Sequence, residues 1–191
     1  SFAAGRRAKA NHQGAFVWAD SSDFDFGSTI TNSFSVRSVG GARFISGIDA
    51  AGLPIAGVEL VSGGGSWSSL SDRNAKENFT AISPREVLER VNRMPITTWN
   101  YKSQDATIRH IGPMAQDFAA AFQVGENDRR ITTVDADGVA LAAIQGLNEI
   151  VQEQKVELKQ KAAEIHSLQQ RLEVLERAIL GRETAQNGGG Q

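Results

Sequence analysis

The sequence of 191 residues predicts an elongated α+β protein in three parts: a β-rich N-terminal segment, a small mixed α/β domain and a C-terminal parallel coiled coil. Two observations carry most of this prediction. Residues 1–70 hold 11 of the 19 glycines, and their apolar residues come in short runs broken by Gly, Ser and Asn, which is typical of strands and turns. Apolar residues then recur at heptad spacing from Ile144 to Ile179, which is typical of a coiled coil.

The composition excludes several classes of protein. With 20 Lys and Arg against 22 Asp and Glu, the net charge of -2 gives no electrostatic basis for binding nucleic acid or an anionic membrane. The absence of Cys excludes a disulfide scaffold, a cysteine zinc site and a thiol nucleophile. No apolar run approaches the roughly 18 residues that cross a bilayer. We therefore expect no nucleic-acid or membrane partner, and we interpret the chain as the C-terminal end of a longer protein.

Residues 1–61 form the predicted β-rich segment, and residues 62–70 form a flexible Gly/Ser linker after it. Gly40-Gly41 lies between two strands and predicts a tight hairpin turn, since Gly supplies the positive φ angles that such turns need. The segment holds too little apolar material for a monomeric core, so we expect subunit association to supply the missing burial. The predicted strands are residues 14–20, 34–39, 42–46 and 57–61.

Residues 71–138 form the predicted mixed α/β domain. Ser83, Pro84 and Glu86 combine an N-cap, a proline at the first helical position and the glutamate of a capping box, so a helix begins here and runs to about Met94. β-Branched and aromatic residues predict the strand that follows, and apolar residues spaced four apart predict the next helix. These later elements are a strand at residues 96–101, a turn at 110–113 and a helix at 114–122 with Met114, Phe118 and Phe122 on its core face.

Residues 139–180 form the predicted coiled-coil helix. Its a sites are apolar at all six heptad starts, whereas two of its d sites are polar. The mixture of β-branched residues and Leu leaves a dimer and a trimer both open. Gly181 ends the predicted helix, and residues 181–191 form a predicted disordered tail. The a sites are Ile144, Val151, Leu158, Ile165, Leu172 and Ile179, and the d sites are Leu147, Gln154, Lys161, Leu168 and Leu175.

The start of the mixed domain carries a Ser/Lys pair, Ser71 and Lys76. A serine hydroxyl becomes a good nucleophile when a base takes its proton, and a lysine serves as that base only if burial lowers its pKa from about 10.4 toward 7–8. Five residues apart on a straight α-helix, the two side chains would point about 140° apart. A working pair therefore requires a bend at Ser71 or a lysine from another subunit. In the alternative interpretation, Ser71 only caps a short helix over residues 72–78.

The other potential ligands do not predict a metal site. Residues 135–138 resemble the start of a calcium loop, but the Glu expected near the end of such a loop is missing, so we interpret them as the break at which the last helix starts. His12 and His166 are isolated from other ligand types in the sequence. We therefore expect no metal ion and no cofactor.

Four stretches occur in order after residue 70, namely residues 71–78, 99–101, 110–117 and 137–145. Together they closely resemble the intramolecular chaperone of endosialidase, also called the peptidase S74 family, over residues 71 to about 180. The resemblance implies an elongated homotrimer whose chaperone domain guides the folding of an upstream fibrous β passenger and then cuts itself off. It implies Ser71 as nucleophile, Lys76 as its base and Leu70–Ser71 as the scissile bond. His110 either orients this site or is a turn histidine bonded to backbone.

Three functional hypotheses follow from the sequence and this resemblance. The first is a self-cleaving serine endopeptidase and trimerisation chaperone whose partners are its own copies and its own passenger, residues 1–61. The second is a non-cleaving structural trimerisation module at the tip of a surface adhesin or phage tail fibre. The third, a DNA-binding regulator released by the same cleavage, fits poorly because the segment before residue 71 is not basic. We expect a phage tail fibre or tail spike, or a bacterial cell surface, as the location, and a glycan ligand of the passenger rests on analogy alone.

Overall fold

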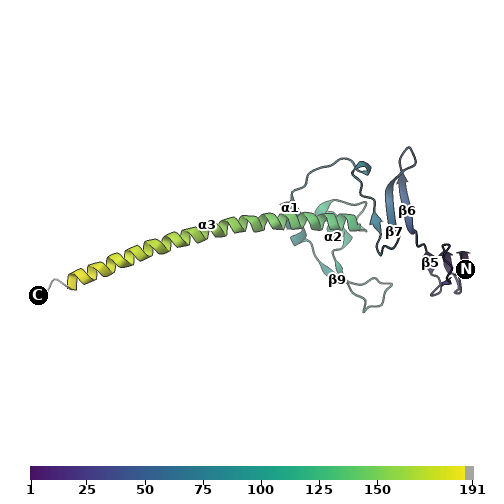
Figure 1. Cartoon of the computed structure of the whole chain (residues 1–191), viewed down its shortest axis with the longest axis horizontal. Coiled ribbons are helices and arrows are strands. Elements are labelled where there is room, and N and C mark those ends of the chain that lie inside the picture. The colour runs from purple at the N-terminus through teal and green to yellow at the C-terminus, as the bar shows by residue number, and fades with distance from the viewer. Residues whose placement is uncertain (188–191) are drawn as a thin grey trace. The chain divides into compact units, whose positions relative to one another are not determined.

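The computed structural model describes residues 1–187, and the chain folds as two compact units. The first unit spans Ser1–Thr80 and consists mainly of strands, whereas the second begins at Ala81 and is mainly helical (Figure 1). The predicted α+β class is therefore confirmed. The first unit holds β1 (Phe2–Gly5), β2 (Ala8–Lys9), β3 (Phe16–Ala19), β4 (Phe26–Gly27), β5 (Phe34–Arg37), β6 (Gly41–Ile48), β7 (Pro54–Val61), β8 (Ser68–Ser69) and the short 3-10 helix η1 (Arg73–Ala75). The second holds α1 (Pro84–Arg93), β9 (Thr97–Trp99), β10 (His110–Gly112), α2 (Ala115–Phe122) and α3 (Thr133–Asn187).

The N-terminal part of the first unit is a coil of parallel strands. β1, β3 and β5 form one parallel sheet, and β2 pairs in parallel with β4 in a second sheet. Alternation along β3 buries Val17 and Ala19 in the core, while Phe16 lies on the opposite face. Phe16 stacks between Phe2 and Phe34, with ring centroids 4.8 and 4.9 Å apart. The same aromatic side chain thus occupies the same register position in three successive turns of the coil.

Arg37, at the end of β5, connects the loops of this coil through hydrogen bonds of its guanidinium group. Its guanidinium donates to the Asp20 carboxylate at 3.1 Å and to the carbonyl oxygens of Ser22 and Phe24 at 2.9 and 2.7 Å. Asp20 also accepts hydrogen bonds from the backbone N–H groups of Val39 and Ser22. These N–H groups, together with the guanidinium, hold the pKa of Asp20 at about 2, below its ordinary value.

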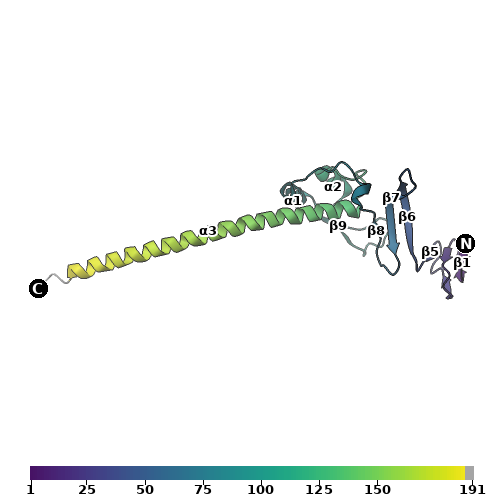
Figure 2. The same cartoon turned by 45° about the horizontal axis from the view of Figure 1, so that its top comes forward.

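The strand pairing differs from the prediction. β3, β5, β6 and β7 fall on the predicted strand segments, but the predicted hairpin at Gly40-Gly41 is wrong. β5 pairs with β3 and β6 pairs with β7, so the turn at Gly40-Gly41 joins two different sheets. The hairpin joins β6 to β7 through residues 49–53 (Figure 2). A glycine turn marks where the chain reverses, but the partner of each strand depends on contacts far away in the sequence.

Residues 62–70, predicted to be a flexible linker, instead form a turn and a strand. Gly64 N–H donates to the Val61 carbonyl at 2.9 Å and closes the turn. β8 then pairs antiparallel with β7, as the edge strand of the sheet ordered β6-β7-β8. The chain just before residue 71 is therefore held in an extended conformation.

Helix α1 begins as predicted. The Ser83 hydroxyl accepts a hydrogen bond from the Glu86 N–H at 3.4 Å, and Pro84 occupies the first helical position. α1 packs on the N-terminal half of α3. Arg85 of α1 donates two hydrogen bonds to the carboxylate of Glu153, at 2.8 and 2.9 Å. This bidentate pair fixes the orientation of α1 along α3.

Small residues of α3 let the two helices approach closely. Ala142 and Ala143 are buried, and so is Gly146. A Cβ atom placed on Gly146 would lie only 2.4 Å from the Pro84 carbonyl oxygen. The backbone of α1 therefore occupies the space that any side chain at position 146 would need.

The predicted turn at residues 110–113 is mostly a strand, because β10 pairs antiparallel with β9 there. The helix predicted to follow is present as α2. Phe118 is buried as predicted and packs against the half-buried Phe122, with ring centroids 5.0 Å apart. Met114, predicted on the same core face, is 38% exposed.

Helix α3 is longer at both ends than the prediction. It begins at Thr133 because the Thr132 hydroxyl accepts the Asp135 N–H at 3.1 Å and donates to the Asp135 carboxylate at 2.7 Å. The predicted break over residues 135–138 is therefore wrong, and the predicted helix end at Gly181 is also wrong, because α3 continues to Asn187. The last part of the predicted disordered tail, residues 188–191, lies outside the described residues.

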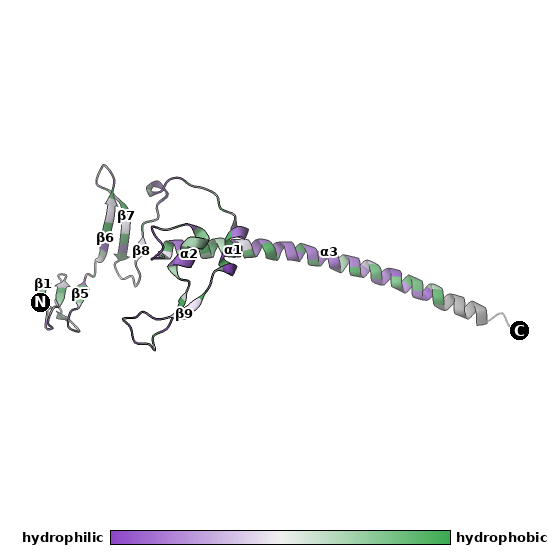
Figure 3. Cartoon of the chain, turned by 180° about the vertical axis from the view of Figure 1, so that it is seen from behind, coloured by the Kyte–Doolittle hydropathy of each residue, from purple (hydrophilic) through white to green (hydrophobic). Residues whose placement is uncertain are grey.

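The heptad residues of α3 face solvent in the single chain. Bands of apolar residues alternate with polar ones along the helix (Figure 3). Val151 is half-buried, whereas the other apolar a and d sites through Ile179 are each more than half exposed. The coiled coil and its trimeric state remain predictions. The exposed sites are Ile144, Leu147, Leu158, Ile165, Leu168, Leu172, Leu175 and Ile179.

Candidate functional site

Ser71 and Lys76 meet across one tight turn. The Lys76 ammonium donates to the Ser71 hydroxyl, with Nζ 2.6 Å from Oγ. Between them lies η1, a single 3-10 turn in place of a continuous α-helix. The structure shows the bend that the five-residue spacing requires when one chain supplies both residues.

Asp72 stabilises this turn as the N-cap of η1. Its carboxylate accepts hydrogen bonds from the Asn74 backbone N–H at 2.8 Å and from the Asn74 side-chain amide at 3.1 Å. Asp suits this position because its short side chain satisfies an N–H group that the first turn of a helix leaves free. The interpretation of Ser71 as the cap of a helix over residues 72–78 is therefore wrong: Asp72 is the cap, and the Ser71 hydroxyl is free to bind Lys76.

The chain after the turn is extended and folds back on it. Lys76 has φ -129° and ψ 153°, and its N–H donates to the Arg73 carbonyl at 3.2 Å. The Arg73 guanidinium lies over the Phe79 ring, with Cζ 5.3 Å from the ring centroid. Asn78 between them adopts the left-handed conformation, with φ 57°, which Asn tolerates better than most residues. These contacts hold the base of the Lys76 side chain in place.

Both side chains of the pair are exposed to solvent. Burial of a lysine favours its neutral form, which is the form that can accept a proton from a hydroxyl. The single chain therefore supplies the geometry of a Ser–Lys pair and leaves both side chains in contact with water.

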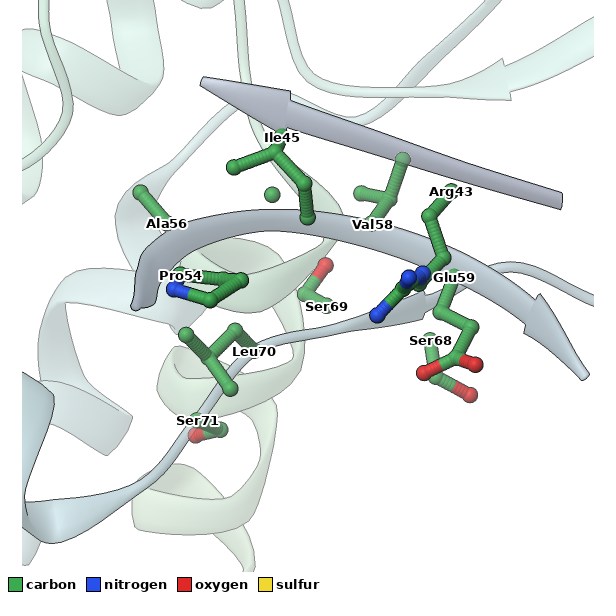
Figure 4. Close-up of a pocket in the computed structure, with 11 residues that line it drawn as sticks. Arg43, Ile45, Pro54, Ala56, Val58, Glu59, Ser68, Ser69, Leu70 and Ser71 are labelled. Carbon is green, nitrogen blue, oxygen red and sulfur yellow. The ribbon is translucent and has the colours of Figure 1, made fainter. Parts of the chain in front are cut away.

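Leu70 and Ser71 line a cavity of about 400 Å³ formed by β6, β7 and β8 (Figure 4). Apolar side chains bound the part of this cavity near Leu70, among them Pro54 and Ala56. The predicted scissile bond thus lies in the wall of a cavity, at the point where an edge strand ends and a turn begins.

His110 lies on β10 in the second unit. Its ring packs against Trp99 and Tyr101, with centroids 4.8 and 5.6 Å away, and its Nε2 is 3.0 Å from the Gln104 side-chain oxygen. It is therefore a strand histidine bonded to a side chain, and the interpretation as a turn histidine bonded to backbone is wrong. Its role in orienting Ser71 and Lys76 remains a prediction.

Within the described residues, no cluster of three or more His, Asp or Glu side chains has a geometry suited to a metal ion. The Nδ1 atom of His12 is 2.8 Å from the hydroxyl of buried Ser28, and the Nε2 atom of His166 is 3.1 Å from the Gln170 amide nitrogen. In the same part of the chain, none of the helices has both the length and the apolar character needed to cross a bilayer.

Sequence reasoning missed two parts of this site, Asp72 and β8. The signal for Asp72 was present, because an Asp side chain often accepts a hydrogen bond from the backbone N–H two residues on and so marks a turn. β8 gave a weaker signal, since Ser68 and Ser69 are poor strand formers and only Trp67 before them favours a strand. The pairing with β7 depends on the tertiary fold.

Residues 71–124 match the family described as chaperone of endosialidase, peptidase S74. A search of curated proteins found no match. The family match begins at Ser71, the residue after the predicted scissile bond, and includes Lys76 and His110; it is shorter than the predicted similarity, which extends to about residue 180. It supports a chaperone role and suggests a peptidase-related function. The match over residues 71–124 thus supports the resemblance to the chaperone-of-endosialidase family, peptidase S74.

Proposed function

We propose that this protein is an intramolecular chaperone that forms a homotrimer, directs the folding of its own N-terminal β passenger and then cuts itself between Leu70 and Ser71. The observation that carries the proposal is the 2.6 Å hydrogen bond between Lys76 Nζ and Ser71 Oγ at the first residues of the family match. A nucleophile and its base within hydrogen-bond reach are the minimum requirement for this chemistry.

The reaction uses the Ser71 hydroxyl as nucleophile and the neutral Lys76 amine as base. Ser71 Oγ attacks the Leu70 carbonyl carbon while Lys76 takes the hydroxyl proton; the C–N bond then breaks, and the proton passes to the nitrogen that becomes the Ser71 amine. The Leu70 acyl group is now an ester of Ser71. Water attacks the ester carbon while Lys76 takes one water proton, and the C–O bond breaks as Lys76 passes that proton to Ser71 Oγ. The products are the Ser71 hydroxyl and a Leu70 carboxyl group that releases its proton to solvent.

Association of three copies gives the pair its chemical activity in this proposal. The exposed heptad stripe of α3 supplies the interface, because burying its apolar side chains favours assembly. Exposure of Ser71 and Lys76 in the single chain means that desolvation must come from outside it. Trimerisation would therefore switch on cleavage only after assembly, at the surface of a phage tail fibre or a bacterial cell.

Expression of the chain followed by denaturing electrophoresis tests the cleavage. We expect two fragments in place of the intact 20.5 kDa chain, the C-terminal one beginning with Ser71 on N-terminal sequencing. Ser71→Ala and Lys76→Ala should each leave the chain intact. Lys76→Arg is the sharper variant, because arginine keeps the charge and the hydrogen bond but does not lose its proton in a protein. Ser103→Ala and Lys102→Arg, adjacent exposed residues in a loop, are matched controls and should be cut like the wild type.

A second function is a permanently attached trimerisation module that does not cut. The exposure of both members of the pair in the single chain favours it. A wild-type chain that stays intact after it has assembled into trimers would establish this second function and reject the protease. Trimeric state is measured independently by light scattering coupled to size-exclusion chromatography.

A further inference from the structure

The backbone before the predicted scissile bond is held as a strand. Ser68 and Ser69 pair with β7, opposite Glu59 and Val58, and the Leu70 N–H donates to the Gly57 carbonyl at 3.1 Å. The ordered pairing therefore continues to the residue that contributes the carbonyl of the scissile bond. Peptides bound to a sheet edge are recognised in this way, with main-chain hydrogen bonds giving affinity and pockets for side chains giving specificity.

Gly57 sits at a kink in the sheet that positions this carbonyl. The register of β6 and β7 shifts between Ile45 and Gly47, directly across from Gly57. Gly57 has φ +151°, and a Cβ there would lie 2.4 Å from the Phe44 carbonyl oxygen. Glycine at this position allows β6 to approach closely, and on the other edge of β7 the Gly57 carbonyl accepts the Leu70 N–H.

The Leu70 side chain lies against an apolar wall. It points toward Pro54, and Ala56 and Ile45 continue the same wall of the 400 Å³ cavity (Figure 4). The charged residues of the cavity, Arg43 and Glu59, lie at its other end (Figure 4). The cavity therefore offers an apolar subsite next to the scissile bond, and the residue that meets it is a leucine, 43% exposed.

We propose that the β6–β7 hairpin is the substrate-binding element of the self-cleavage reaction. β7 holds residues 68–70 as an added strand, the Gly57 carbonyl fixes the Leu70 N–H, and the apolar wall selects an apolar side chain at position 70. Cleavage then requires a folded hairpin, so the passenger presents its own scissile bond only after this part of it has folded. Gly57 and the hairpin residues are positioning residues, and the inference rests on the proposed self-cleavage.

The cleavage test compares substitutions at position 70 with a control outside the hairpin. Leu70→Asp should slow cleavage by about tenfold or more, because a misplaced reacting group costs up to about 10²-fold. Leu70→Met should restore cleavage to within about twofold of the wild-type rate, since it keeps an apolar side chain of similar volume. Ile30→Asp places the same charge at an apolar residue of the first unit that is 65% exposed and lies outside both the hairpin and the cavity, and it should leave the rate unchanged.

A second measurement does not depend on cleavage. In the Ser71→Ala protein with leucine-selective labelling, NMR should show the Leu70 amide exchanging with solvent at least about tenfold more slowly than an unstructured amide, because it is hydrogen-bonded. Leu70→Asp cut at the wild-type rate, or an unprotected Leu70 amide, would overturn the inference. If the wild type is not cut at all, the proposed protease fails, and amide exchange alone decides whether β7 holds this strand.

Discussion

The contact between α1 and α3 predicts that the same substitution, Gly to Ala, has opposite effects at two glycines of α3. Gly146 is buried beneath α1, and a Cβ there would lie 2.4 Å from the Pro84 carbonyl oxygen and 3.1 Å from the Arg85 nitrogen. Gly138 is exposed on the same helix, and a Cβ there would meet no atom within 4 Å. Gly146→Ala and Gly138→Ala therefore make the same chemical change in opposite surroundings.

The magnitude follows from the distances. Ordinary contact begins at 3.4 Å, so Gly146→Ala must move the α1 backbone by about 1 Å (3.4 minus 2.4). Overpacking of this kind costs roughly 1–3 kcal/mol, against a gain of about 1 kcal/mol from the better helix propensity of alanine. Gly138→Ala receives only the gain. We expect the two variants to differ by about 1–3 kcal/mol in the stability of the α1–α3 contact, which is roughly five- to 150-fold in its opening equilibrium.

Amide hydrogen exchange in α1 measures this equilibrium in the full chain, in a Ser71→Ala background that keeps the chain intact. It reports local opening, so the two compact units need not unfold together. Gly146→Ala should speed exchange across α1 relative to wild type, and Gly138→Ala should leave it unchanged or slow it. Equal protection in the two variants would refute the argument that the backbone of α1 excludes a side chain at position 146.

Three further predictions concern assembly, acid stability and the turn. Ile165→Asp should reduce the trimer measured by light scattering, whereas Val156→Asp, an equally exposed apolar residue outside the heptad stripe, should not. Because the pKa of Asp20 is depressed to about 2, the contribution of Asp20 to stability is present above about pH 4 and is lost as the pH falls through 2. Circular dichroism should show that Asp20→Asn weakens the first unit at neutral pH and removes part of this acid dependence. Asp23→Asn, which changes an exposed ion-pair carboxylate, should have little effect. Asp72→Ala removes the cap of η1, worth about 1 kcal/mol, and should slow cleavage about fivefold on denaturing gels; an unchanged rate would show that the turn does not hold Ser71 against Lys76.

Local sequence patterns were sufficient to predict the features that depend on neighbouring residues. Ser83, Pro84 and Glu86 specify the start of α1 within one helical turn, and that prediction is confirmed. The heptad spacing specified one long helix, and the Ser71–Lys76 spacing specified that a bend was needed if one chain supplied both residues. Resemblance in several ordered motifs identified the family, which the match over residues 71–124 confirms.

The tertiary structure sets how the strands pair and what surrounds the proposed scissile bond. Gly40-Gly41 predicted a hairpin, yet β5 and β6 join different sheets, because a strand chooses its partner through contacts far away in the sequence. For the same reason the local sequence of residues 62–70 predicts a linker, whereas pairing with β7 makes part of this segment the strand β8. The pair at Ser71 and Lys76 could be named from the sequence, but the strand that presents Leu70 to it is a product of long-range pairing, which no local pattern encodes.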